Sequence, residues 1–93
     1  MDQILVEFKQ RMKIYHASED ETLRDILKTS YEDIRHLIGD FDIRQYQAGK
    51  ELVFERSRYV YNDSLEYFYA NFQQRILDLS LELMGGGNYA FKL

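Results

Sequence analysis

Proline does not occur among the 93 residues of this chain, and three of its five glycines stand together at positions 85–87. Proline lacks the backbone N–H that the interior of a helix uses, and glycine weakens helices because the unfolded chain gains entropy. Long segments before position 85 are therefore free to be helical. The sequence predicts an all-α fold, with a small bundle of about four helices in one domain at residues 1–84 and a flexible, glycine-hinged C-terminal tail at residues 85–93.

The clearest helical pattern covers residues 19–38. Its apolar side chains recur at helical spacing and form one stripe, on which Ser30 also lies: Leu23, Ile26, Leu27, Ile34, Leu37 and Ile38. Ser18 and Glu21 have the spacing of a capping box, in which each side chain bonds the backbone N–H of the other residue. Gly39 stands where many helices end in a left-handed residue. We therefore expect a long amphipathic helix between a capping box and a glycine.

Three further helices are expected, at residues 3–12, 47–61 and 64–83. Their inward faces are, in chain order, Leu5, Phe8 and Met12, then Leu52, Val53, Tyr59 and Val60, then Leu65, Phe68, Tyr69, Phe72, Ile76, Leu79 and Leu83. Asp63, with Glu66 three residues later, indicates a helix start and separates the last two helices. Without that break the two would form one long rod. Apolar and polar residues alternate at 40–46, which permits a short extended piece.

Composition and charge exclude several classes of site and partner. The chain has no cysteine, which rules out disulfides, cysteine zinc sites and a cysteine nucleophile. Its net charge is −4, and most of the acidic excess lies at residues 18–40, so no helix offers the clustered Lys and Arg that phosphate contacts need. The first residues lack the basic and apolar regions of a signal peptide, and no apolar run reaches the ~18 residues of a membrane span.

The candidate metal sites match poorly. Asp40, Asp42 and Glu51 occupy positions 1, 3 and 12 of a calcium-loop window, but Arg44 and Gln45 stand where a ligand and the turn glycine are needed. The two histidines, at positions 16 and 36, are far apart and have no paired ligand spacing. Pairs of acids lie near helix ends or on polar faces, where solvent and the helix dipole account for them. We therefore expect no catalytic residue, no cofactor and no metal.

Aromatic residues concentrate in one segment, residues 51–72, which holds seven of the fourteen in the chain. That is more aromatic area than one small core buries, and tyrosine is common at interfaces because it combines a large ring with a polar tip. We expect an interface with another subunit or partner here, formed by Arg56, Tyr59, Tyr61, Tyr67 and Tyr69. Arg56 lies on the apolar stripe of its helix. It either extends along the surface to solvent or forms a salt bridge to an acid of the 19–38 helix or of a neighbouring subunit.

One motif stands out within the aromatic segment. It reads Glu51-Leu52-Val53-x-Glu55-Arg56-x-Arg58-Tyr59-x-Tyr61-Asn62-Asp63 and is followed by Phe68, Phe72 and Ile76. Before it stand an opening helix with Phe8 and Met12, the start Ser18-Glu19-Asp20-Glu21 with Leu23, Ile26 and Leu27, and Gly39. With these features the chain resembles, over nearly its whole length, the small head–tail connector proteins of long-tailed bacteriophages, also called adaptor or head-completion proteins. The short, glycine-hinged tail departs from that pattern.

The resemblance implies a structural protein of the virion, made in the cytoplasm of the bacterial host and without enzymatic activity. Such a protein assembles as a ring, often twelve-fold, beneath the portal protein and joins the head to a stopper or tail-completion protein. It extends a channel through which DNA passes without sequence-specific binding, and it involves no membrane. We expect the acids of the second helix to face that channel: Glu19, Asp20, Asp25, Glu32 and Asp33. We expect the tail side chains to contact the portal or a neighbouring subunit: Tyr89, Phe91 and Leu93.

Other classes of function stay open. A small cytoplasmic helical interaction module or regulator would bind one partner through a helix-in-groove contact and would form no ring. A helix-turn-helix DNA-binding protein would need a basic recognition helix, which the charge pattern does not provide. An enzyme is the least expected class, since no nucleophile–base pair or metal-ligand spacing is present.

Overall fold

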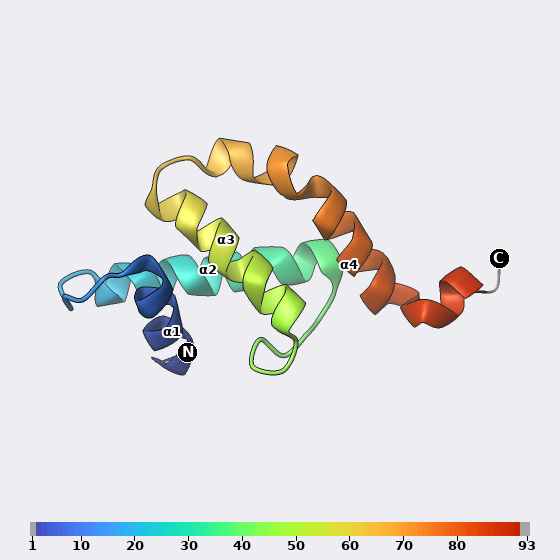
Figure 1. The fold of residues 1–93 in the computed structure, drawn as a ribbon, viewed down its shortest axis with the longest axis horizontal. Coiled ribbons are helices and arrows are strands. Elements are labelled where there is room, and N and C mark those ends of the chain that lie inside the picture. The colour runs from blue at the N-terminus through green and yellow to red at the C-terminus, as the bar shows by residue number, and fades with distance from the viewer. Residues whose placement is uncertain (1, 92–93) are drawn as a thin grey trace.

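The chain folds as a series of α-helices in the computed structural model, which describes the backbone of residues 2–91 and the side chains of residues 2–84. In chain order the elements are α1 (Asp2–Met12), α2 (Asp20–Ile38), α3 (Gln47–Tyr61), the short 3₁₀ helix η1 (Leu65–Tyr67) and α4 (Phe68–Phe91) (Figure 1). The described residues contain no strand, so the predicted all-α class with four helices is confirmed. The side chains of the expected tail lie outside the described residues, and with them the expected contacts of Tyr89, Phe91 and Leu93.

α2 forms the centre of the bundle, and the other helices pack around it (Figure 1). α1 lies against the N-terminal half of α2, and α3 crosses the middle of α2. The chain reverses direction after α3, and α4 arches back to pass the C-terminal end of α2. There a Cβ placed on Gly39 would lie 3.7 Å from Leu83 Cβ of α4. The molecule is elongated, with extents of 51 × 26 × 18 Å.

The core forms where the inward stripes of the helices meet. Its largest wholly buried apolar side chains come from all four helices: Phe8, Leu23, Leu27, Ile34, Leu52, Val53, Phe54, Phe68 and Leu79. The rings of Phe8 and Phe54 lie 5.5 Å apart and join α1 to α3. Phe68 stacks on Phe72 at 5.0 Å within α4. Burying each such side chain contributes roughly 1.5–3 kcal/mol, so these stripes are the main favourable term in folding.

The start of α2 differs from the predicted capping box. The helix begins at Asp20, its N-cap residue is Glu19, and no side chain caps it. Ser18 Oγ instead lies 2.9 Å from His16 Nδ1, and the Asp20 carboxylate pairs with Lys9 of α1 at 2.5 Å. The capping-box prediction was wrong because a contact with another helix orders this turn, and local spacing does not reveal such a contact.

The end of α2 and the connector after it form tight turns. Gly39 has φ +111° and ψ 169°, a positive φ that favours glycine as predicted, and its N–H donates to the Arg35 carbonyl. Residues 40–46 form no strand, and a turn occupies residues 43–45. The Asp42 carboxylate accepts from the backbone N–H of Arg44 at 2.9 Å, which is the side-chain turn that aspartate favours in loops.

The break between α3 and α4 is confirmed, but Asp63 does not begin the next helix. Asp63 has φ +56° and its N–H donates to the Val60 carbonyl, while the N–H of Ser64 donates to the Tyr59 carbonyl at 2.8 Å. These bonds satisfy the last carbonyls of α3, with Asp63 as the left-handed residue that ends the helix. Asp63 thus ends α3, and the N-cap prediction for it was wrong.

α4 is longer than the predicted 64–83. Residues 65–67 form η1, and α4 itself spans Phe68–Phe91. Its backbone includes the three glycines, since glycine lowers helix propensity by about 1 kcal/mol per residue without excluding helical dihedral angles.

Candidate protein-interaction site

Arg56 joins three helices at the centre of the aromatic segment. Its Nε donates to the Asp33 carboxylate of α2 at 3.0 Å, and its Nη1 donates to Ser30 Oγ at 3.0 Å. Tyr69 of α4 donates its hydroxyl to the same Asp33 oxygen at 2.8 Å. Only 8% of Arg56 is exposed, so of the alternatives for this residue the structure shows the salt bridge to an acid of the second helix. We call these four residues the Arg56 cluster.

The Arg56 cluster explains why polar residues stand on apolar stripes. The hydroxyl of Ser30 lies on the inner face of α2 because it accepts from a buried guanidinium there. Burial is the largest influence on the pKa of Tyr69 and raises it, the hydrogen bond from Arg56 lowers it, and the hydrogen bond to Asp33 raises it, with a net rise. The hydroxyl of Tyr69 therefore stays protonated at neutral pH and donates a hydrogen bond to Asp33. The cluster fixes where α4 begins relative to α2 and α3.

The four tyrosines expected at an interface have different surroundings. Tyr59 is half-buried, and its ring packs edge-on against two phenylalanines of α4. Tyr61 donates its hydroxyl to a glutamate ahead of α2 at 2.8 Å, and Tyr69 belongs to the Arg56 cluster. Tyr67 is 61% exposed. Three of the four stabilise packing within the chain, so Tyr67 offers the most area to a partner. An interface role for the tyrosines and Arg56 stays a prediction.

The five acids expected to face a channel have different surroundings. Three of them make contacts within the chain: Glu19 with a tyrosine of α3, Asp20 with a lysine of α1, and Asp33 in the Arg56 cluster. Asp25 and Glu32 are exposed on α2, and neither forms an ion pair with another described residue. These two carboxylates are therefore the ones that can meet DNA or a partner, and their position in a channel stays a prediction.

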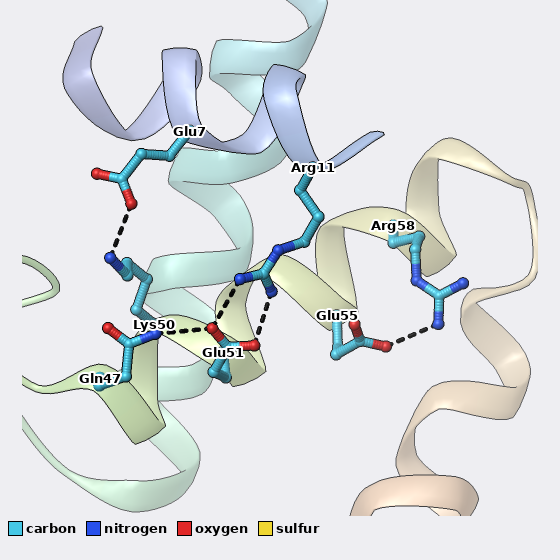
Figure 2. Close-up of polar contacts among 7 residues, drawn as sticks. All are labelled: Glu7, Arg11, Gln47, Lys50, Glu51, Glu55 and Arg58. Carbon is cyan, nitrogen blue, oxygen red and sulfur yellow. Dashed lines mark hydrogen bonds and ion pairs between the residues drawn. The ribbon is translucent and has the colours of Figure 1, made fainter. Parts of the chain in front are cut away.

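Figure 2 shows the polar contacts that join α1 to α3. Arg11 meets the Glu51 carboxylate with both terminal nitrogens, at 2.7 and 2.8 Å, and Lys50 lies 2.8 Å from Glu7. The hydrogen bond from Arg11 lowers the pKa of Glu51, and the hydrogen bond from Lys50 lowers the pKa of Glu7. Sequence reasoning missed both pairs, because their members are 40 and 43 positions apart. They hold α1 in place and pair the charges on this face.

The residues considered for a metal site do not come together. Asp40 pairs with an arginine of α2 at 3.0 Å, Asp42 accepts from the connector backbone, and Glu51 pairs with α1. Within the part of the chain that the structure describes, no three histidine or acidic side chains are placed to hold a metal ion. None of the helices described there combines the length and the apolar character that a membrane span requires.

α4 carries a second apolar face, which sequence reasoning missed. One face packs on the core, and three large side chains on another face are exposed: Leu77 (50%), Leu81 (48%) and Met84 (77%). They are spaced four and three residues apart, so they lie in one row along the helix, and we call them the outer stripe. The sequence signal was the dense apolar run at residues 76–84, which holds more apolar side chains than one helix face accommodates.

Among the described residues, the arrangement offers apolar area for contact with another macromolecule rather than a group of converging reactive side chains. Comparisons with protein-family models, with curated proteins and with solved structures give no match. We therefore argue the function from the chain's own residues.

Proposed function

We propose that the protein is a structural component of a bacteriophage virion that assembles as a ring beneath the portal and connects the head to the tail or its stopper. The single observation that carries this proposal is the outer stripe of α4. Contiguous exposed apolar side chains on a soluble protein usually mark contact with another chain. A small body that buries its own core and still presents such a row suits a subunit of a larger assembly.

The resemblance at residues 51–63 supports the same role, because residues of that motif hold the helix break in place. Arg56 bonds α2 and α4, Tyr59 packs against α4, and Tyr61 bonds Glu19 ahead of α2. These contacts fix the direction of α4 relative to the rest of the body. A ring subunit needs a fixed shape, since a closed ring forms only when the rotation between subunits closes.

The charge pattern supports a channel that does not hold DNA. The chain carries a net charge of −4, and Glu32 is exposed on α2. Carboxylates that face a channel repel the phosphates of DNA and give it no stable contact. Reversing this charge with Glu32→Lys is expected to slow the release of DNA from the particle. An unchanged rate of release would contradict this part of the proposal.

The partners in this proposal are other copies of the chain, the portal protein, and a stopper or tail-completion protein. The tail is proposed to contact the portal or the next subunit through Tyr89, Phe91 and Leu93, as their apolar character indicates. Deletion of residues 88–93 is expected to abolish attachment to heads. Attachment of the shortened chain would place the anchor elsewhere, in the region of the helix break.

The direct test is co-sedimentation of the purified protein with DNA-filled heads that lack tails. We expect saturable binding, followed by tail joining when tails are added. Heads assembled without the portal are the matched control, and they are expected to bind no protein. Absence of binding to portal-containing heads would contradict the proposal.

A second function follows from the same outer stripe if no ring forms. A small interaction module would place Leu77, Leu81 and Met84 in a groove of a single partner. Such a protein would form a one-to-one complex and would not bind phage heads, so the co-sedimentation experiment separates the two functions.

A further inference from the structure

The outer stripe has a structural counterpart elsewhere on the same molecule. A groove of about 260 Å³ lies between α2 and the region where α3 leads into η1, with apolar walls from Ile26, Val60 and Leu65. Pockets for small molecules usually measure ~300–1,000 Å³, so this groove suits one or two side chains of another protein. We call it the α2–α3 groove.

The surface of the α2–α3 groove is mostly apolar, and three polar residues complete its lining: Arg56, Asp25 and Thr29. The Nε and Nη1 of Arg56 donate within the Arg56 cluster, whereas its Nη2 has no acceptor among the described residues. A carboxylate is the strongest acceptor for such a nitrogen. The groove therefore fits an aliphatic side chain with an acid beside it.

The outer stripe has this chemistry. Asp78 directly follows Leu77 and stands three residues before Leu81, so its carboxylate borders the stripe. Within the described residues, Asp78 accepts one side-chain hydrogen bond, from Gln74 Nε2 to its Oδ1 at 2.9 Å. Its other carboxylate oxygen is open to a cation.

The outer stripe and the α2–α3 groove cannot meet within one molecule. The groove is lined by residues 25–29 in the N-terminal half of α2 and by the region where α3 leads into η1, whereas α4, which carries the outer stripe, passes the C-terminal end of α2 (Figure 1). Contact between them therefore joins two copies through two different surfaces. Such a heterologous contact repeats around a closed ring or along an open filament.

We infer that the outer stripe of one copy docks into the α2–α3 groove of the next copy, with Leu81 in the groove and Asp78 on Arg56. This inference rests on the proposed ring and names the contact between its subunits. The outer stripe covers about two helical turns, whereas stable interfaces bury ~1,200–2,000 Å². One contact alone is therefore weak, and the ring holds because each copy is bound on both sides.

The test uses the absence of cysteine from the chain, because every disulfide then joins introduced cysteines only. The variant carries Leu81→Cys in the outer stripe and Val60→Cys in the groove, and it is oxidised in concentrated solution and on heads. We expect a ladder of dimers, trimers and longer chains on a non-reducing gel. An equal mixture of the two single variants is expected to stop at dimers, since each copy then carries only one half of the contact.

Two results would overturn the docking. Dimers of the Leu81→Cys variant alone would show that the outer stripe pairs with itself. Absence of any disulfide between copies, at protein concentrations that saturate heads, would show that the two surfaces do not meet. A second pair, Leu77→Cys with Leu65→Cys, replaces the first if circular dichroism shows that the first variant is unfolded.

The charge contact is tested separately from the apolar contact. In the double-cysteine variant, Asp78→Asn is expected to lower the yield of the disulfide between positions 60 and 81 at least about fivefold, because a close charge pair is lost. Glu21→Gln removes another exposed carboxylate that lies outside both surfaces, and it is expected to leave the yield unchanged. Equal yields from these two variants would overturn the contact of Asp78 with Arg56.

Failure of the docking and failure of the connector proposal give different results. If the double-cysteine variant binds heads saturably but forms no disulfide between positions 60 and 81, the docking is overturned and the connector proposal stands. The ladder in solution, with no binding to heads, would support the docking and overturn the connector proposal.

Discussion

The guanidinium of Arg56 on α3 lies 3.0 Å from the carboxylate of Asp33 on α2. Both groups also bond the hydroxyl of Tyr69 near the start of α4, so one ion pair sets how three helices meet. A buried ion pair adds little stability compared with apolar residues of the same size, but loss of one member leaves a charge without its partner. The Arg56–Asp33 pair therefore acts mainly on the arrangement of the helices.

Removal of the acid is predicted to destabilise the fold more than removal of the base. Asp33→Ala leaves a guanidinium whose side chain is only 9% exposed without its carboxylate, and we expect the free energy of unfolding to fall by about 2–4 kcal/mol. Arg56→Met keeps apolar volume and leaves a carboxylate that is 30% exposed, so we expect a fall below about 2 kcal/mol. Urea unfolding followed by circular dichroism measures both changes.

An exposed ion pair provides the control for that comparison. Arg24 lies 3.3 Å from Asp2, and both side chains are largely in solvent. Arg24→Ala is expected to change the free energy of unfolding by no more than about 0.5 kcal/mol. Equal losses in the Asp33→Ala and Arg56→Met variants would contradict the difference in burial between the two partners.

The sequence predicted the helices well where an apolar stripe decides their position. α3 has the predicted bounds, and α2 starts one residue later than predicted, because each stripe must face the core whatever the loops do. Helix ends were predicted less well. Ser18 and Asp63 both have cap chemistry, but Ser18 contacts His16 and Asp63 ends α3. Which of several polar contacts a residue makes depends on neighbours that local spacing does not identify.

The candidate site depended more on contacts between distant residues. A charged residue on an apolar stripe reaches solvent or finds a partner, so a salt bridge of Arg56 to the second helix was one of the alternatives that the sequence left open, and it did not identify Asp33 as the partner. The pairing of Arg11 with Glu51 spans 40 positions and left no pattern in the sequence. The outer stripe was visible in the composition of residues 76–84, but the whole fold decides which face of α4 packs on the core.

Alanine at Gly49 is predicted to destabilise the protein, although alanine favours helices. A Cβ there would lie 2.5 Å from Phe41 Cε2, and the Phe41 ring packs between Tyr31 and Tyr46. Overpacking of this kind outweighs the gain in helix propensity of about 1 kcal/mol, so we expect a net loss of about 1–2 kcal/mol for Gly49→Ala in urea unfolding.

A smaller side chain at position 41 separates the two effects. In a Phe41→Leu background, Gly49→Ala is expected to cost at least about 1 kcal/mol less than in the natural sequence, because the obstructing ring is absent. The same cost in both backgrounds would show that the backbone, and not the Phe41 ring, limits this position.

Acid is predicted to weaken the junction of α1 and α3. The hydrogen bond from Arg11 holds the pKa of Glu51 below its ordinary value of 4.5, so the unfolded chain takes up a proton at higher pH than the folded protein does. The stability from this pair is therefore fully present above the unfolded pKa and is lost as pH falls through the folded pKa.

Glu51→Gln is the variant that tests this acid dependence. It is expected to lower the free energy of unfolding at pH 7 by less than about 1 kcal/mol, because both partners are more than one third exposed. The difference from the natural protein is expected to shrink as the pH is lowered below the unfolded pKa. A difference that stays constant from neutral to acidic pH, measured by urea unfolding, would count against the pair.

Alkali is predicted to weaken the contact between the connector and α4. Burial, with the hydrogen bond to Glu82, raises the pKa of Tyr46 from 10.0 to about 12. The stability from this raised pKa is present below the unfolded value and is lost as pH rises through the folded value. Tyr46→Phe is expected to lose less stability between neutral pH and pH ~11 than the natural protein does.

Tyr15, which is 83% exposed, supplies the matched control for that titration. Tyr15→Phe is expected to keep the alkaline loss of the natural protein in urea unfolding. If Tyr46→Phe shows the same alkaline loss as Tyr15→Phe, the hydroxyl of Tyr46 is not the group responsible.

The number of protein copies bound per head at saturation tests the connector proposal most directly. Quantitative mass spectrometry of washed, DNA-filled heads gives this number over a series of protein concentrations. The account predicts one fixed, ring-like number of copies per portal that does not change when more protein is added. A single copy per portal, or a number that rises steadily with protein concentration, would contradict it.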